Sequence, residues 1–132
     1  MILNIKNHLI ENFGTTNEPI HTFRAPARIN VIGEHVDYLG GFVLPAAIDF
    51  QVCVSARKNS IGRIRLYSEQ YKEVATTDKP LSDKSHSWAN YVYGVVDELL
   101  KAKFPVSGFD MGIDGNIQQG AGLSSSAALE VV

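Results

Sequence analysis

Hydrophobic side chains follow helical spacing in two parts of the chain. They recur at every third or fourth position across residues 2–13, and Gly14 stands where a left-handed residue would end a helix. A second helix is predicted over residues 88–103, with one broad apolar face formed by Trp88, Tyr91, Val92, Val95, Val96, Leu99 and Leu100. Ser85 or Ser87 is placed to cap its start. Both segments are therefore expected to bury one face.

Alternating apolar and polar positions predict strands elsewhere. One strand begins at residues 21–25, is broken or offset at Pro26 and runs on to Gly33, and the nearly continuous apolar run 42–48 is typical of buried chain. Further strands are predicted at residues 51–56, 63–67, 72–77 and 108–115. A turn at residues 60–62 predicts that the strands on either side of it pair antiparallel. The predicted fold class is α+β, in one unit over residues 1–132 with no internal repeat.

Composition and charge exclude several classes of function. The chain has 132 residues, of which 45% are hydrophobic and 20% charged, as in an ordinary globular domain. A net charge of −2 gives no basic footprint for nucleic acid or an anionic membrane. No apolar run approaches the roughly 20 residues that span a bilayer, and the N-terminus has no secretory signal pattern. We therefore expect a cytoplasmic protein. The single cysteine, Cys53, lies in an apolar run and is expected to be buried without a catalytic role, and His8 is expected at the surface.

Charged and polar residues concentrate in the segment 25–45. Arg28, Glu34, His35 and Asp37 fall within ten residues, after a β-branched run and before the Gly-Gly pair at positions 40 and 41. Carboxylates and an imidazole presented on a turn suit the hydroxyls of a polyol, because ionised acceptors make the stronger hydrogen bonds. A solvated surface loop has the same polar character, and that alternative stays open.

A second segment, residues 118–130, is rich in glycine and serine. Gly120 and Gly122 remove side chains that would keep a ligand from the backbone, and Leu123 is expected to plug the loop into the core. Hydroxyl groups follow at the start of a predicted helix, on Ser124, Ser125 and Ser126. The N–H groups of a first helical turn favour a phosphate, and a serine hydroxyl there can ligate Mg²⁺.

Other interpretations of the second segment are partly excluded. A P-loop needs Gly-Lys-Ser/Thr, which is absent, and a dinucleotide fingerprint needs glycine where Ser125 stands. A strand-to-helix turn with a serine cap needs no ligand, and it remains an alternative.

Together the two segments resemble the first two signature motifs of the galactokinase family, within the GHMP small-molecule kinases. The first motif matches over residues 25–45 and the second over residues 119–130, and residues 88–96 between them are also similar, so the resemblance covers nearly the whole chain. The Gly-Glu-His-x-Asp-Tyr stretch is the most specific part. Ala27 stands where glycine is usual, and Val36 where threonine is common. The resemblance implies the N-terminal part of a GHMP-kinase-type domain, related to the ribosomal S5 domain 2-like fold.

The resemblance also implies a reaction and roles for residues. ATP would donate its γ-phosphoryl group to the C1 hydroxyl of α-D-galactose, with Arg28 near the sugar O1 as a catalytic residue. The sugar would be bound by Glu34, His35, Val36 and Asp37. The nucleotide would be bound by Ser68 and by Gly120, Ala121, Gly122, Leu123, Ser124, Ser125 and Ser126, with Ser126 as a Mg²⁺ ligand. Galactose and ATP are the expected partners, and the full-length protein is expected to be a monomer.

Family members are much longer than 132 residues. Their catalytic aspartate and the acidic residue that completes the Mg²⁺ site would lie beyond Val132. We therefore expect a truncated domain that is inactive alone. Two related functions stay open, namely a GHMP kinase for N-acetylgalactosamine or arabinose, and a sensor that binds sugar and ATP without turnover. The intact serine run favours an enzyme.

Overall fold

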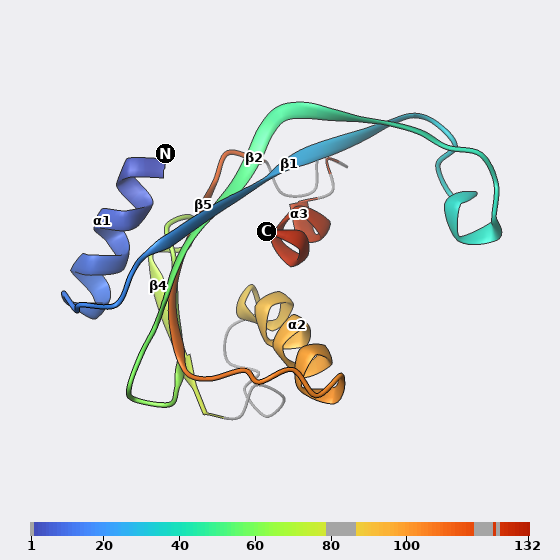
Figure 1. The fold of residues 1–132 in the computed structure, drawn as a ribbon. Helices are drawn as coiled ribbons and strands as arrows, with labels where there is room; N and C mark the ends of the chain where they lie inside the picture. Colours follow the sequence, from blue (N-terminus) through green and yellow to red (C-terminus); the bar gives the residue numbers. More distant parts are fainter. Residues whose placement is uncertain (1, 79–86, 118–122, 124) are drawn as a thin grey trace.

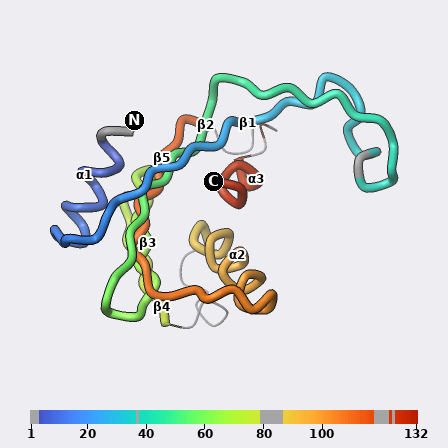
Figure 2. The backbone as a smooth tube through the Cα atoms, in the orientation of Figure 1, coloured from blue at the N-terminus to red at the C-terminus, as the bar shows by residue number. Residues whose placement is uncertain are grey.

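The computed structural model describes residues 2–78, 87–117, 123 and 125–132. In these residues a five-stranded mixed sheet packs between helices, which confirms the α+β class (Figure 1). The elements in chain order are α1 (Ile2–Phe13), β1 (His21–Ile32), the 3₁₀ turn η1 (Asp37–Leu39), β2 (Leu44–Lys58), β3 (Ile64–Ser68), β4 (Glu73–Thr77), α2 (Ala89–Lys101), β5 (Phe109–Gly115) and α3 (Ser125–Val131). Helix α1 covers one face of the sheet, and α2 and α3 lie on the other (Figures 1 and 2).

Helix α1 is anchored by two fully buried side chains, Ile5 and Leu9. The absence of a side chain at Gly112 in β5 lets the helix come close, since a Cβ there would lie 3.1 Å from Cδ1 of Ile5. The helix ends as predicted, because Gly14 has a φ of 77° and its N–H donates to the carbonyl of Ile10 at 2.7 Å.

Strand β5 lies at the centre of the sheet, in the strand order β1-β2-β5-β3-β4. It pairs antiparallel with β2 and parallel with β3. The predicted antiparallel pairing of β2 with β3 is therefore wrong. The connection between them spans the end of β5, where the Asn59 N–H donates to the Gly108 carbonyl at 3.0 Å. The turn residues at 60–62 show that the chain reverses direction there. They do not show that β5 lies between β2 and β3 in the sheet.

Strands β1 and β2 form a long antiparallel hairpin. Its register shifts between Pro26 and Ala27, so the proline offsets the ladder without ending the strand, as predicted. The distal part projects beyond the helices (Figures 1 and 2), and the side chains of Phe42, Val43 and Leu44 are exposed there. The prediction that residues 42–48 form buried chain is wrong. Residues 42–45 and 47 are exposed and only Ala46 and Ile48 are partly buried, because no described helix covers the distal end of the hairpin.

Helix α2 buries a narrower face than its sequence predicts. Ala89, Val92, Tyr93 and Val96 are buried, whereas Tyr91, Leu99 and Leu100 are exposed. No side-chain hydrogen bond caps the helix at Trp88, so a cap by Ser87 is wrong, and Ser85 lies outside the described residues. No helix of the described part is long and apolar enough to cross a membrane.

A buried charge network ties the sheet to α1. The fully buried carboxylate of Asp110 accepts from Nε of Arg57 at 3.0 Å, from Nε and Nη2 of Arg65 at 2.7 and 2.8 Å, and from Asn59 at 2.7 Å. Arg57 also donates to the carbonyl of Phe13 at 3.0 Å. Burial alone would raise the pKa of the Asp110 carboxyl, but the hydrogen bonds from Arg65, Asn59 and Arg57 outweigh it and lower that pKa.

The two remaining single-residue predictions can also be compared with the fold. Cys53 is fully buried in β2, and burial raises the pKa of its thiol, which agrees with a spectator role. His8 is only partly exposed and contacts Glu11 and Glu69, so it is less of a free surface residue than predicted.

Candidate functional site

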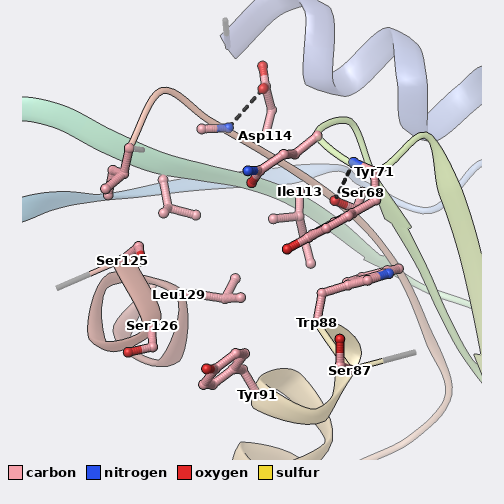
Figure 3. A pocket seen from close by; sticks show the side chains of 14 residues that line it. Ser68, Tyr71, Ser87, Trp88, Tyr91, Ile113, Asp114, Ser125, Ser126 and Leu129 are labelled. Atoms are coloured by element: carbon pink, nitrogen blue, oxygen red, sulfur yellow. Dashed lines mark hydrogen bonds between the residues drawn. The ribbon is translucent and has the colours of Figure 1, made fainter. Parts of the chain in front are cut away.

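A cavity of about 370 Å³ opens where four elements converge on one face of the sheet (Figure 3). The ends of β3 and β5 form its floor, and the starts of α2 and α3 form its sides. Ser68 from β3 and Ser125 and Ser126 from α3 all line it. The structure therefore brings together serines that lie far apart in the sequence and that sequence analysis assigned to one nucleotide site.

One wall of the cavity is aromatic. The Tyr71 ring stacks on Trp88 with ring centroids 6.1 Å apart and planes inclined by 13°, and Tyr91 also lines the cavity (Figure 3). The Trp88 indole N–H donates to Glu73 at 3.2 Å, which fixes the ring. The apolar pattern of this helix predicts that its aromatic residues belong to the core. That prediction holds for the buried Trp88 but is wrong for Tyr91, which is 44% exposed.

Ser68 anchors the turn that carries Tyr71. It is the last residue of β3 and is buried, and its Oγ accepts a hydrogen bond from the N–H of Tyr71 at 3.5 Å. Tyr71 itself was not identified from the sequence. No periodic pattern around Tyr71 indicates a role in a site, because its stacking partner Trp88 lies 17 positions later in the sequence.

The first turn of α3 forms the opposite side. Ser125 and Ser126 contribute hydroxyl groups to the cavity, and the partly buried Leu123 packs against the hydrophobic core, as predicted for a plug. Backbone N–H groups of a first helical turn and nearby hydroxyls suit the oxygens of a phosphate. Gly120, Ala121, Gly122 and Ser124 lie outside the described residues.

A backbone hydrogen bond joins the two sequence motifs. The N–H of Arg28 in β1 donates to the carbonyl of Leu123 at 3.3 Å. The preceding residue, Ala27, is fully buried in the core cluster, which fixes this part of β1 against the loop. The Arg28 side chain is exposed. Arg28 thus lies beside the segment that leads into α3, with its guanidinium available to a ligand.

The Glu34–Asp37 segment is shaped by glycine and backbone contacts. Gly33 has a φ of 99°, and a Cβ there would lie 2.5 Å from the carbonyl oxygen of Phe42. The Val36 carbonyl accepts from the N–H groups of Leu39 and Gly41, at 3.1 and 2.8 Å. The φ of His35 is 62°, an uncommon value for a residue with a side chain. Glycine conformation and backbone hydrogen bonds therefore fix the path of the chain in this turn, although the turn is exposed to solvent.

The side chains of this turn are exposed. Glu34 and His35 are open to solvent, and the Asp37 side chain lies outside the described part. Among the described residues, no ion pair involves Arg28, Glu34 or His35. The His35 ring lies edge-on to the Tyr38 ring, with the ring centroids 6.5 Å apart. The turn lies at the far end of the β1–β2 hairpin from α3 (Figure 1), so the structure does not bring these residues to the cavity.

The described residues contain no group of three or more His, Cys, Asp or Glu side chains that could hold a metal ion. Asp114 is the one carboxylate residue among the described residues that line the cavity, and the two serines of α3 are the lining residues that follow the glycine-rich segment most closely in the sequence. Mg²⁺ is commonly held by few protein ligands together with several phosphate oxygens or waters.

Comparisons with known proteins point to one family. Residues 8–58 match the family model described as the galactokinase galactose-binding signature. Residues 90–132 match the model of the GHMP kinases N terminal domain. The structure is similar to that of Lactococcus lactis galactokinase complexed with galactose, with 37% sequence identity and a TM-score of 0.89. That similarity covers 99% of this chain and 35% of the other, so the chain spans about a third of the galactokinase that it matches.

More distant kinases share the fold alone. Mevalonate kinase of Methanococcus jannaschii is 18% identical with a TM-score of 0.70, over 88% of this chain and 38% of that one. Phosphomevalonate kinase of Streptococcus pneumoniae is 16% identical with a TM-score of 0.63, over 84% and 34%. The two motif matches and the similarity to the Lactococcus lactis enzyme identify the group more closely: the chain belongs to the galactokinase family of the GHMP kinases.

Proposed function

We propose that this chain supplies the sugar-binding and phosphate-binding parts of a galactokinase, which transfers the γ-phosphoryl group of ATP to the C1 hydroxyl of α-D-galactose. The observation that carries the proposal is the contact between the two motifs. Arg28 lies on the strand that hydrogen-bonds to Leu123, and three residues later Ser126 lines the cavity. The backbone of a cationic residue is thus held beside the segment that leads to the proposed phosphate site.

The nucleotide is proposed to occupy the cavity. Its purine would lie against the aromatic wall of Tyr71, Trp88 and Tyr91, because flat apolar surfaces favour stacking with a base. Its phosphates would lie at the start of α3, where Ser125 and Ser126 line the cavity directly after the glycine-rich stretch of the sequence. Ser68 would contact the nucleotide from the end of β3.

Ser126 is proposed to hold Mg²⁺ together with phosphate oxygens. Ser126 lines the cavity, and Mg²⁺ is commonly held by few protein ligands together with phosphate oxygens. The cation, when bound, would neutralise charge on the phosphates. The chain's own contribution is to orient the phosphates through Ser125, Ser126 and the N–H groups of the helix start.

The sugar is proposed to bind along the β1–β2 hairpin. Glu34, His35 and Asp37 would accept or donate hydrogen bonds to its hydroxyls. Val36, whose carbonyl is already engaged by Leu39 and Gly41, would offer its N–H. Arg28 would stabilise charge on the transferring phosphoryl group, because a guanidinium that is not engaged in an ion pair of the described residues can pair with a developing anion.

The proposal is tested by forming galactose 1-phosphate from galactose and ATP. Two proteins are compared: the 132-residue chain, and a chimera in which this chain replaces the matched third of Lactococcus lactis galactokinase. We expect transfer by the chimera, and Arg28→Ala should lower its kcat by about 10²-fold or more. The chain alone should bind ATP without turnover.

Three results would each contradict a part of this proposal. A folded chimera that binds galactose but phosphorylates it as fast with Arg28→Ala as without would remove the assigned role of Arg28. A chimera that prefers N-acetylgalactosamine or arabinose in a panel of sugars would move the proposal to a related sugar kinase. Turnover by the 132-residue chain itself would show that the chain contains every group that the transfer needs.

A further inference from the structure

The turn between β3 and β4, residues 69–72, separates the cavity from α1. Gln70 and Tyr71 line the cavity, as does Ser68 just before the turn. Glu69 instead contacts His8, which lies on α1 at the other face of the sheet. One turn therefore carries cavity-lining residues and a carboxylate that has no contact with the cavity.

Glu69 contacts residues on three other elements and within its own turn. Its Oε2 accepts from the Tyr67 hydroxyl at 2.8 Å and lies 3.3 Å from Nε2 of His8. Its Oε1 pairs with Lys72 three residues on, and its backbone N–H donates to the carbonyl of Ile113 in β5 at 2.9 Å. The turn is thereby joined through one residue to β3, to β5 and to α1.

The ionised form of Glu69 is the one that these contacts favour. The hydrogen bond from Lys72, followed by that from Tyr67, lowers the pKa of the Glu69 carboxyl against the effect of its burial. Burial and then the hydrogen bond to Glu69 raise the pKa of Tyr67 to about 12. At neutral pH the pair is a charged acceptor and a neutral donor, which is the stronger arrangement.

The turn needs such a restraint. Lys72 has a φ of 55°, a left-handed conformation that residues with side chains seldom adopt. Its side chain is paired with Glu69, so the ion pair holds the closing residue of the turn. The position of the Tyr71 ring against Trp88 depends on how this turn closes.

We propose that Glu69 is a positioning residue of the nucleotide site, which fixes the 69–72 turn so that Ser68 and the Tyr71 ring form the cavity wall against Trp88. The role rests on the proposed function, because it assumes that the cavity takes the nucleotide. It adds a residue outside the cavity to those that determine nucleotide affinity.

Trp88 provides a direct measurement. It is the only tryptophan in the chain and it lines the cavity, so its fluorescence reports both the stacking of Tyr71 and the binding of ATP. The 132-residue chain is titrated with MgATP, and the emission spectrum and dissociation constant are compared between variants. Tyr71→Leu, which removes the stacking ring, defines the response to a lost wall.

Glu69→Gln is the main variant, and Glu11→Gln is its matched control. Both carboxylates lie 3.3 Å from a ring nitrogen of His8, but Glu11 lies on α1 and does not contact the turn. We expect Glu69→Gln to change the Trp88 emission as Tyr71→Leu does and to weaken ATP binding about fivefold, the size expected for a weakened hydrogen bond to a charged group. Glu11→Gln should change neither.

Lys72→Met is a second variant that leaves the fold intact, because the Lys72 side chain is 66% exposed. It should weaken ATP binding in the same direction by about twofold, as expected for the loss of a partly exposed ion pair. If the wild-type chain binds MgATP and both Glu69→Gln and Lys72→Met bind it as tightly, the positioning role of Glu69 is overturned. The proposed nucleotide site would then still stand. A wild-type chain without any response would overturn the proposed nucleotide site, and the role of Glu69 with it.

Discussion

Two groups of charged residues occupy opposite situations in this molecule. Around Asp110, the carboxylate and the guanidinium groups of Arg57 and Arg65 satisfy one another, and the Arg57 and Asp110 side chains are almost fully buried. Along the β1–β2 hairpin, Arg28 and Glu34 are exposed, and no ion pair of the described residues includes them. The residue types are the same in both groups.

The difference shows what to look for in a binding site. Charges that are paired and desolvated hold elements together, and they have no remaining capacity for a ligand. Along the hairpin, contacts of Gly33 and of the Val36 carbonyl fix the backbone, while the charged side chains that it carries stay available to a ligand. A rigid backbone beneath unpaired charges is therefore a better indicator of a site than the charges alone.

The largest effect on stability is expected from Asp110→Ala. It leaves the Arg57 guanidinium buried without its carboxylate, which typically costs about 3–5 kcal/mol. Urea unfolding followed by circular dichroism measures the loss. A free energy of unfolding within about 1 kcal/mol of wild type would show that water or another acceptor replaces the carboxylate.

A smaller loss is expected from Gly33→Ala in the hairpin. The φ of 99° and a Cβ 2.5 Å from the Phe42 carbonyl oxygen should together cost about 1–3 kcal/mol and displace the Glu34–Asp37 turn. Gly40→Ala is the control, since its φ is 73° but nothing lies within 4 Å of an added Cβ. Equal effects of the two variants on galactose binding by the chimera would show that the contact with Phe42 does not shape the turn.

Acid should weaken the Asp110 network less than truncation does, because a protonated side chain still fills its site. The pKa of Asp110 is lowered in the folded chain, so its contribution is complete above its ordinary pKa of 3.8 and is lost as the pH falls from there towards the lowered value. Unfolding free energies between pH 5 and pH 2.5 should fall more steeply for the wild type than for Asp110→Asn. Parallel curves would exclude Asp110 as the source of acid sensitivity.

The smallest change in stability is expected from Arg28→Ala. Its exposed side chain has no partner to lose among the described residues, so the free energy of unfolding should stay within about 0.5 kcal/mol of wild type. Its effect should be confined to phosphoryl transfer by the chimera. A destabilisation comparable to that of Asp110→Ala would place Arg28 with the structural charges and remove the contrast.

Local features of the fold were predictable from the sequence. The helix at residues 2–13 with its Gly14 terminus, the strand with Ile64 and Leu66 facing inward, and the helix after the serine run all depend on nearest neighbours in the chain. The two charged and glycine-rich motifs were recognisable for the same reason, because each is contiguous.

Features that depend on distant residues were not predictable. The insertion of β5 between β2 and β3, the exposure of Phe42 at the end of the hairpin and the burial of Tyr93 in place of Tyr91 are all set by which element packs where. The Tyr71–Trp88 wall and the Glu69 contacts were missed for this reason. The assignment of Ser68 and Ser126 to one site came only from the family resemblance, since no local pattern links β3 to α3. Both residues line the same cavity.

The central position of β5 affects how the chain can fold during synthesis. The edges of β2 and β3 that face each other in the finished sheet receive their partner only when Phe109–Gly115 has been made. That segment follows Ser68 by roughly 40 residues, or about 2–8 s at a ribosomal rate of about 5–20 residues per second. During this interval both edges can pair with another nascent chain, so dense polysomes and slow translation between β3 and β5 favour aggregation.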